Sequence, residues 1–466
     1  MADFFVVSNR GPFGAIEAEP GVVSLKRGAG GLVTALLPLV RSKTINWVFP
    51  ISAPAELAAL ELGLYSQDLD GIFPVVLDAQ THEAAYNKIS NELLWYLNHG
   101  MFSLSRGPSF DSALYSNWHL YRNYSQVMAE FLAQMAPSQA KVMLQDYHMF
   151  LVAGDLAALR PDIEISLFLH TPFATPSEFA ILPDSIATEL LTSLGTLGHF
   201  GFHCTAWRDN YLATAANASI STAARTWVNP LGSDLDELEA VRNGESATVQ
   251  VNELRKLASG RKVIARVDRM EPSKNILRGI DAVVEMLKFY PHLINKVVHI
   301  ANCYPSREGV DDYADYAREV AKKASSANRY LRELAGNLGI PVDADPILVF
   351  NVDDYPLSLA VLSIYDVLLV NPIRDGFNLV ASEGPLLNAS DGTLILSANA
   401  GIAEVIGDAA IVVNPFDVRE TALAIYHALQ ADQVPRRQRA LRLKERLSKR
   451  NSRTWFGEQM NWFENR

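Results

Sequence analysis

The residues best suited to chemistry lie between residues 366 and 385, in the sequence DVLLVNPIRDGFNLVASEGP. The apolar run at 367–370 is typical of a strand buried in a parallel sheet, and residues 378–380 suit the first turn of a helix. The N–H groups and positive dipole at such a helix start could bind a phosphate. Glu383 lies two helical turns beyond Asp375, where a carboxylate could accept hydrogen bonds from both hydroxyls of a ribose. A simple strand-to-helix junction capped by Asp375 is the alternative.

Two cations, Arg269 and Lys274, lie five residues apart in the segment VIARVDRMEPSKNILRG. This segment predicts a strand, a loop and a helix, with both cations on the loop. Side chains placed in this way could both reach one diphosphate. A solvated basic loop is the other interpretation.

Polar residues also follow the predicted strands of the N-terminal half. Arg10 follows the strand at 4–8, and Asp146 and His170 follow two later strands. The carboxyl ends of parallel strands share one edge of a sheet, where open α/β sheets bind ligands. Taken singly, Arg10 could be a surface residue and His170 a structural histidine.

A glycine loop containing Gly28, Gly30 and Gly31 precedes an apolar helix within residues 24–40. Glycine would let the backbone approach a ligand closely. The loop does not fit GxGxxG, and the sequence has no GK[ST] motif, so the loop alone is a weak signal.

Composition limits the class of protein. The 466 residues predict two or three domains, and the net charge of −11 argues against a nucleic-acid or membrane-surface binder. No apolar run reaches the roughly 18–20 residues of a membrane span, and no signal peptide is evident. The cysteines, Cys204 and Cys303, favour a reducing compartment and argue against a zinc site. We therefore expect a soluble cytoplasmic protein.

The order of elements predicts two α/β domains. Helices are expected over residues 84–99, 118–135 and 152–159, and a loop at 100–117 joins the first two. The sequence Asn229-Pro230-Leu231-Gly232 interrupts the pattern, and the polar stretch up to residue 260 suggests an interdomain region. A second domain is expected to start at Lys262, and a final apolar helix at the C-terminus.

The motifs resemble those of the trehalose-6-phosphate synthase family of glycosyltransferases. RDGFNLVASE is similar to the family's RDGxNLVxxE, YNKISNELLW to YNGxxNxxLW, RMEPSKN to RLDxxKG and YPSR to xxPSR. About eight such motifs occur in the same order along nearly the whole chain. The resemblance implies an α/β GT-B fold with two doubly wound Rossmann-like domains facing a central cleft. It places the acceptor domain at 1–230, the nucleotide-sugar domain at 231–450 and a helix crossing back at 451–466.

The resemblance also implies roles for individual residues. Those expected to bind the donor are Gly30, Gly31, Arg269, Lys274, Asp375, the backbone amides of Gly376, Phe377, Asn378 and Leu379, and Glu383. Those expected to bind the acceptor are Arg10, Tyr86, Trp95, Asp146 and Arg307. His170 would contact the transferring sugar, and we place it with Arg269, Lys274 and Asp375 in the catalytic set.

The implied reaction is transfer of glucose, or a related sugar, from a UDP- or GDP-linked donor to a sugar phosphate with retention of configuration. Cations and amides would stabilise the departing phosphate. We find no convincing DxD metal motif and expect neither a metal nor a cofactor, nor a nucleic-acid or membrane partner. Homo-oligomerisation stays open.

Four segments depart from the family pattern. Ser273-Lys274-Asn275 replaces KG, GPLLN follows Glu383 in place of YVAxQ, HTPFA replaces HIPFP, and SANAGIAE replaces SEFAGAA. The first two resemble pseudo-glycosyltransferases, which join an activated cyclitol to an aminocyclitol phosphate through a C–N bond. This enzyme is the first alternative, and a catalytically inactive sugar-phosphate sensor is the second.

Overall fold

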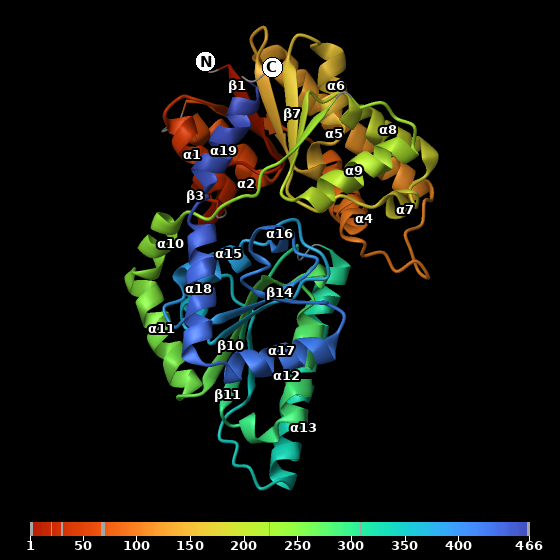
Figure 1. Ribbon diagram of the computed structural model, residues 1–466. Coiled ribbons are helices and arrows are strands. Elements are labelled where there is room, and N and C mark those ends of the chain that lie inside the picture. Colours follow the sequence, from red (N-terminus) through yellow and green to blue (C-terminus); the bar gives the residue numbers. More distant parts are fainter. Residues whose placement is uncertain are drawn as a thin grey trace. The chain divides into compact units, whose positions relative to one another are not determined.

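The structure is a computed structural model that describes residues 3–19, 21–28, 31–66, 70–222, 224–307 and 310–463. The chain forms two compact units. Unit 1 consists of Met1–Pro230 together with Ser452–Arg466, and unit 2 consists of Leu231–Asn451. Each unit has its own parallel sheet with helices packed against it (Figure 1).

Within the described ranges, unit 1 is built on a seven-stranded sheet with the order β5-β4-β1-β6-β7-β8-β9. All neighbouring strands are parallel. The strand order reverses between β1 and β6, and ligands bind beyond the carboxyl ends of the strands at such a switch point. The strands are β1 Phe4–Val7, β4 Asn46–Ile51, β5 Ile72–Val76, β6 Lys141–Gln145, β7 Glu164–Leu169, β8 His199–Phe202 and β9 Arg225–Val228.

Side chains of this sheet alternate between two helical layers, as the two-residue period of a strand requires. Phe5 and Val7 pack into the larger core, whereas the ring of Phe4 meets Phe456 and Phe463 of the C-terminal segment edge to face. The helices of unit 1 are α1 Gly31–Arg41, α2 Pro54–Glu61, α3 Ala79–Glu83, α4 Trp95–His99, α5 Ser112–Met135, α6 Val152–Leu159, α7 Pro176–Phe179, α8 Asp184–Gly195, α9 Thr205–Asn217 and α19 Ser452–Trp462, with a π-helix at Ala84–Leu94 and short 3-10 helices at Leu64–Ser66 and Tyr147–Met149.

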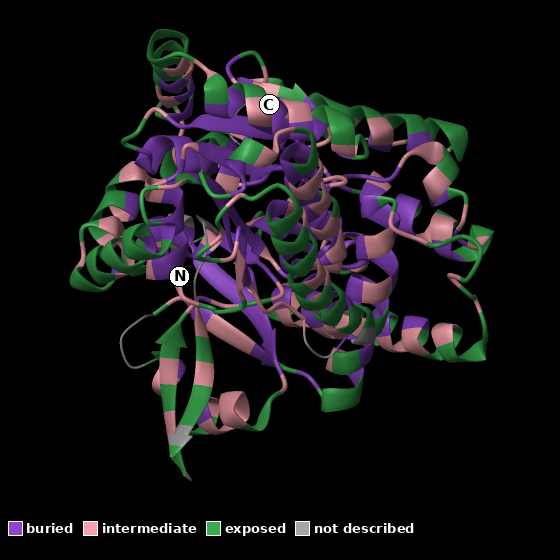
Figure 2. Ribbon diagram, turned by 90° about the horizontal axis from the view of Figure 1, so that it is seen from below, coloured by how far each residue is buried: buried purple, intermediate pink, exposed green. Residues whose placement is uncertain are grey.

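Unit 2 repeats the design with a six-stranded sheet in the part of the chain that is described, in the order β12-β11-β10-β13-β14-β15. The order reverses between β10 and β13, so residues beyond the ends of these strands lie at the switch point. Buried residues are concentrated in the strands of both sheets (Figure 2). The strands are β10 Lys262–Arg269, β11 Val297–Tyr304, β12 Ile347–Phe350, β13 Val367–Val370, β14 Thr393–Ser397 and β15 Ile411–Val413.

Helices cover both faces of this second sheet. One layer contains α12, α13 and α17, and the other contains α14, α15 and α18, with α10 and α11 packed on α14. The helices are α10 Leu235–Arg242, α11 Glu245–Ala258, α12 Ile276–Phe289, α13 Asp311–Asn337, α14 Tyr355–Ser363, α15 Val380–Leu387, α16 Ala403–Ile406, α17 Val418–Gln430 and α18 Gln433–Leu447, with 3-10 helices at Pro272–Lys274 and Pro291–Leu293.

The structure differs from the local predictions in two places and adds one element that was not predicted. The polar stretch before residue 260, expected to be an interdomain region, contains α10 and α11 of unit 2. Residues ahead of the glycine loop form a hairpin, β2 Phe13–Glu19 with β3 Val22–Arg27, that the sequence analysis did not predict. The helix expected at 118 begins at Ser112, where Asp111 caps it by accepting a hydrogen bond from the N–H of Leu114 at 3.0 Å. None of the helices in the described ranges is long and apolar enough to cross a membrane.

Candidate active site

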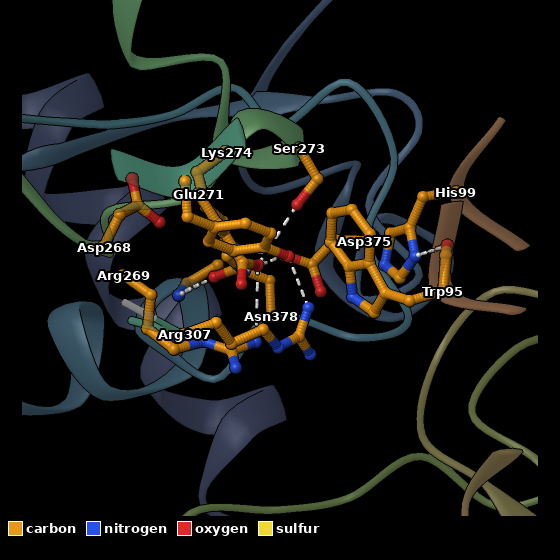
Figure 3. A network of polar contacts seen from close by, with 12 residues as sticks. Trp95, His99, Asp268, Arg269, Glu271, Ser273, Lys274, Arg307, Asp375 and Asn378 are labelled. Atoms are coloured by element: carbon orange, nitrogen blue, oxygen red, sulfur yellow. Dashed lines mark hydrogen bonds and ion pairs between the residues drawn. The ribbon is translucent and has the colours of Figure 1, made fainter. Parts of the chain in front are cut away.

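Acidic and basic side chains gather at the switch point of unit 2, among them Arg269, Lys274, Glu271 and Asp375 (Figure 3). Arg269 ends β10, and Lys274 lies on the short helix that follows it. Lys274 Nζ lies 2.5 Å from Asp375 Oδ2 and 3.9 Å from Glu271 Oε1. Arg269 Nη2 lies 3.3 Å from the same Glu271 oxygen. The two predicted cations therefore share one carboxylate, and the sequence spacing did place them together.

The two cations of this cluster keep their charge. Burial lowers the pKa of Lys274, but Asp375 and then Glu271 outweigh burial, so the net pKa is raised. The carboxylate of Glu271 raises the pKa of Arg269 as well. Both cations are therefore charged at neutral pH. Such fixed positive groups can stabilise negative charge on a departing phosphate.

Backbone hydrogen bonds join the loops that carry these residues. Ile373 N–H donates to the Ser273 carbonyl at 2.8 Å, and Asp375 N–H donates to the Asn399 carbonyl at 3.1 Å. The segment that carries Ile373 and Asp375 connects β13 directly to α15, as the sequence predicted. Gly376, Phe377 and Leu379 lie on this connection just before α15 begins. Their proposed amide contacts with a diphosphate stay a prediction.

Asn378 holds the turn before α15 in shape. Its φ of +84° lies in the left-handed region, which asparagine tolerates better than most residues. Its Nδ2 donates to Asp375 Oδ2 at 3.0 Å, and its Oδ1 accepts from Ala381 N–H at 3.1 Å. Asp375 Oδ2 thus receives hydrogen bonds from both Asn378 and Lys274, which fixes the carboxylate at the start of the helix.

Asn275 explains one departure from the family pattern. It has a φ of +61°, the conformation that glycine adopts most easily. Its Nδ2 donates to the carbonyls of Asn371 at 2.9 Å and Pro415 at 2.8 Å, and its Oδ1 accepts from Arg278 at 3.0 Å. Here the side chain ties the loop after β10 to the loops after β13 and β15.

Glu383 lies on α15, as predicted, and is partly buried. Burial, followed by the charge of Glu237 on α10, raises the pKa of Glu383 to about 7. Its carboxyl group therefore changes charge near neutral pH. A group that accepts hydrogen bonds from ribose hydroxyls would do so best above that pH.

Three other predicted residues are the donor-side Gly30 and Gly31 and the acceptor-side Arg307. Gly30 lies outside the described residues, and Gly31 is the first residue of α1. Arg307 follows β11 with a φ of +47°; its Nη1 donates to the Tyr313 hydroxyl, and the guanidinium lies 5.4 Å from the centre of the Tyr313 ring. Arg307 belongs to unit 2 and Arg10 to unit 1, so their joint hold on a phosphate stays a prediction.

In unit 1, the structure brings Arg10 and Tyr86 together. Arg10 Nη2 donates to the Tyr86 hydroxyl at 2.7 Å, and its guanidinium lies 5.6 Å from the ring centre. Tyr86 sits on the π-helix, a form that occurs frequently at functional sites. Trp95 on α4 is 1% exposed and stacks on His99 with ring centres 4.0 Å apart.

Asp146 and His170 meet at the carboxyl edge of this sheet. Asp146 Oδ1 accepts a hydrogen bond from His170 N–H at 3.1 Å. Asp146 has a φ of +71° and a ψ of 174°, an unusual conformation for a residue other than glycine. Such strain is most often found at functional sites. Burial lowers the pKa of His170 to about 4, so its imidazole is neutral.

Comparison with known proteins places the chain in a family. The model of glycosyltransferase family 20 matches residues 2–465. The chain belongs to glycosyltransferase family 20. A trehalose-6-phosphate synthase from Mycobacterium sp. (strain KMS) is 30% identical over 475 residues, covering 95% of this chain and 91% of the relative. A bifunctional trehalose-6-phosphate synthase/phosphatase from Thermoproteus tenax is 28% identical over 97% of this chain, which spans 62% of that longer protein.

A solved structure agrees with the family assignment. The trehalose-6-phosphate structure from E. coli, bound with UDP-2-fluoro glucose, is 25% identical, has a TM-score of 0.83 and covers 99% of each chain. The predicted GT-B fold and the predicted glycosyltransferase class are confirmed. So is sugar transfer from a nucleotide sugar to a sugar phosphate as the class of reaction, and these family 20 relatives do not favour the cyclitol-coupling or sensor alternatives.

Three residues of this family 20 site were not selected from the sequence. Glu271, 1% exposed, lies between the cations and was hidden inside the motif RMEPSKN. Arg266 on β10 is fully buried, and its guanidinium donates to the Lys274 carbonyl at 3.3 Å. His203 contacts His170 and directly follows β8, so the rule of polar residues after strands could have found it.

Proposed function

We propose that this chain transfers glucose from UDP-glucose to glucose 6-phosphate, forming trehalose 6-phosphate and UDP. The observation that carries the proposal is the cluster of Arg269, Lys274 and Asp375 at the start of α15. It offers two fixed cations and a helix N-terminus to one diphosphate. UDP is favoured over GDP because the E. coli relative was solved with a UDP sugar.

The donor lies on unit 2 in this proposal. Arg269 and Lys274 bind the diphosphate together with the amides of Gly376 to Leu379, and Glu383 accepts hydrogen bonds from the ribose hydroxyls. Asp375 meets the glucosyl group. When the bond from the anomeric carbon to the diphosphate breaks, the negative charge that develops faces groups already fixed in place.

The acceptor lies on unit 1. Arg10 binds its phosphate with help from Arg307, Tyr86 and Trp95 line the sugar, and Asp146 binds its hydroxyls. The leaving phosphate takes the acceptor's proton, so no pair of enzyme carboxylates is needed. The reaction requires neither metal nor cofactor. Its phosphorylated substrates favour the cytoplasm as its compartment.

A panel of substrates tests the proposal. UDP-glucose, GDP-glucose and a nucleotide-activated cyclitol are each incubated with glucose 6-phosphate, glucose or an aminocyclitol phosphate, and the released nucleotide and the product are measured. Trehalose 6-phosphate from UDP-glucose and glucose 6-phosphate is the expected result. Product only from the activated cyclitol and the aminocyclitol phosphate would establish the C–N coupling alternative, and no turnover with any pair would favour the sensor.

A further inference from the structure

A row of polar side chains crosses the carboxyl edge of the unit 1 sheet. Gln145 ends β6, and His170, His203 and Asn229 directly follow β7, β8 and β9. These strands are neighbours in the sheet, so the four side chains come from four adjacent strands. Gln145, His203 and Asn229 are each 2% exposed. Buried polar groups need hydrogen-bond partners, so the direction of each bond can be worked out.

The backbone of Asn229 sets the donor and acceptor direction of these hydrogen bonds. His203 is hydrogen-bonded to the backbone of Asn229, whose own N–H already donates to the Phe202 carbonyl at 2.8 Å. The carbonyl of Asn229 is therefore the acceptor, and a ring N–H of His203 donates to it. Because His203 Nε2 faces His170, the donating nitrogen is Nδ1. A neutral imidazole has a single N–H, so His203 Nε2 carries a lone pair.

That lone pair decides the tautomer of His170. His170 Nδ1 lies 3.2 Å from His203 Nε2, so it must carry the proton and donate it. His170 Nε2 is then an acceptor, 2.9 Å from the side-chain amide oxygen of Gln145. Two acceptors repel each other, whereas a half-turn of the amide brings its NH2 group to His170. The Gln145 amide nitrogen, which has no other partner among the described residues, then gains one.

We propose that His203 is a positioning residue for the transfer reaction. It keeps the proton of His170 on Nδ1 and fixes the orientation of the ring. The inference rests on the proposed function, in which His170 contacts the transferring sugar. Because both ring nitrogens of His170 are engaged, the ring offers the substrate a neutral, fixed edge, and the acceptor's proton leaves by another route.

The C-terminal helix supports the far end of the row. Trp455 Nε1 of α19 donates to the Asn229 carbonyl at 3.1 Å, and Asn229 Nδ2 donates to the Trp455 carbonyl at 3.0 Å. The Trp455 ring also lies 5.5 Å from the His170 ring. The position of Asn229, and through it the tautomer of both histidines, therefore depends on α19.

The test uses the full chain labelled with 15N-histidine. Long-range proton–nitrogen NMR spectra give the tautomer of His170, which is assigned by the signal that disappears in His170→Gln. We expect the wild-type proton on Nδ1. In His203→Phe the ring shape remains but the acceptor is lost, so the proton should move to Nε2 and kcat should fall about tenfold, as for one lost hydrogen bond. His203→Gln offers a side-chain acceptor and should restore much of kcat.

His199→Gln is the matched control. His199 begins β8, the strand that His203 follows. It is 4% exposed and contacts Glu164, Trp462 and Phe463 instead of His170. Its replacement should leave the His170 tautomer and kcat unchanged. A wild-type proton on His170 Nε2, or equal losses of kcat in His199→Gln and His203→Phe, would overturn the proposal. Because the tautomer is measured without substrate, this result is separate from failure of the wild-type chain to turn over UDP-glucose.

Discussion

Replacing Arg269 by alanine should abolish most of the activity while leaving the fold nearly intact. The Arg269 side chain is 42% exposed and pairs with Glu271 at 3.3 Å. A partly exposed ion pair of this kind contributes at most about 1 kcal/mol to stability. In Arg269→Ala the buried carboxylate of Glu271 still has two polar partners, Ser273 Oγ at 3.1 Å and Lys274 Nζ at 3.9 Å.

The loss of activity should be much larger than the loss of stability. If Arg269 stabilises charge on the leaving diphosphate, its removal costs about 3–4 kcal/mol in the transition state, or about a hundred- to a thousandfold in kcat. UDP release from UDP-glucose with glucose 6-phosphate gives kcat, and thermal unfolding gives Tm. We expect a Tm within a few degrees of wild type.

Arg261 provides the control, because it precedes the same strand that Arg269 ends. Its guanidinium donates to the carbonyls of Ala258 at 3.0 Å, Asp345 at 3.0 Å and Leu257 at 2.9 Å. Arg261→Ala should therefore lower Tm more than Arg269→Ala and leave kcat unchanged. A kcat of Arg269→Ala within fivefold of wild type would refute the diphosphate role.

Three further predictions concern the same two units. The KM for UDP-glucose should rise as pH falls through about 7, where Glu383 becomes protonated, and Glu383→Gln should remove this dependence. The unfolded Glu383 carboxyl loses its proton near pH 4.5 and the folded one near 7, so stability falls as pH rises from about 4.5 to about 7 and stays lower above it. Glu383→Gln should therefore raise Tm at pH 8 but not at pH 4. Asn275→Gly should remain folded, but its free energy of unfolding should fall by about 1–3 kcal/mol because the side-chain hydrogen bonds are lost. Asn275→Ala should be less stable still, because alanine is strained at a φ of +61°. Equal free energies of unfolding in urea for the two variants would contradict this. Arg10→Gln should raise the KM for glucose 6-phosphate at least tenfold with little change for UDP-glucose, and equal effects on both substrates would exclude an acceptor-specific role.

The sequence could predict the fold because its strands are strongly apolar and end in polar residues. The segment from β13 to α15 follows directly from the run at 367–370, the turn at Asp375 and the helical pattern that follows. The helices α10 and α11 could not be predicted in this way, because their buried surface is a narrow stripe in a polar sequence. Their hydrophobic pattern is too weak to outweigh the polar composition.

The residues of the candidate active site also differ in whether the local sequence could predict them. Arg269 and Lys274 could be predicted because one loop carries both, so their spacing alone limits how far apart they lie. The contacts of Glu271 and His203 depend on how loops or strands distant in sequence are brought together. No local pattern reports that His203 lies beside His170, because the pairing is set by the order of β7 and β8 in the sheet.

The replacement of KG by Ser273-Lys274-Asn275 was one of two features that suggested C–N coupling, and the structure gives this replacement another explanation. A glycine at this position would supply the left-handed backbone conformation alone. Asn275 adopts that conformation at a φ of +61° and also holds the carbonyls of Asn371 and Pro415. The substitution therefore changes how the diphosphate loop is held, while Lys274 still meets Asp375. A difference explained by the backbone carries no information about which acceptor the enzyme uses.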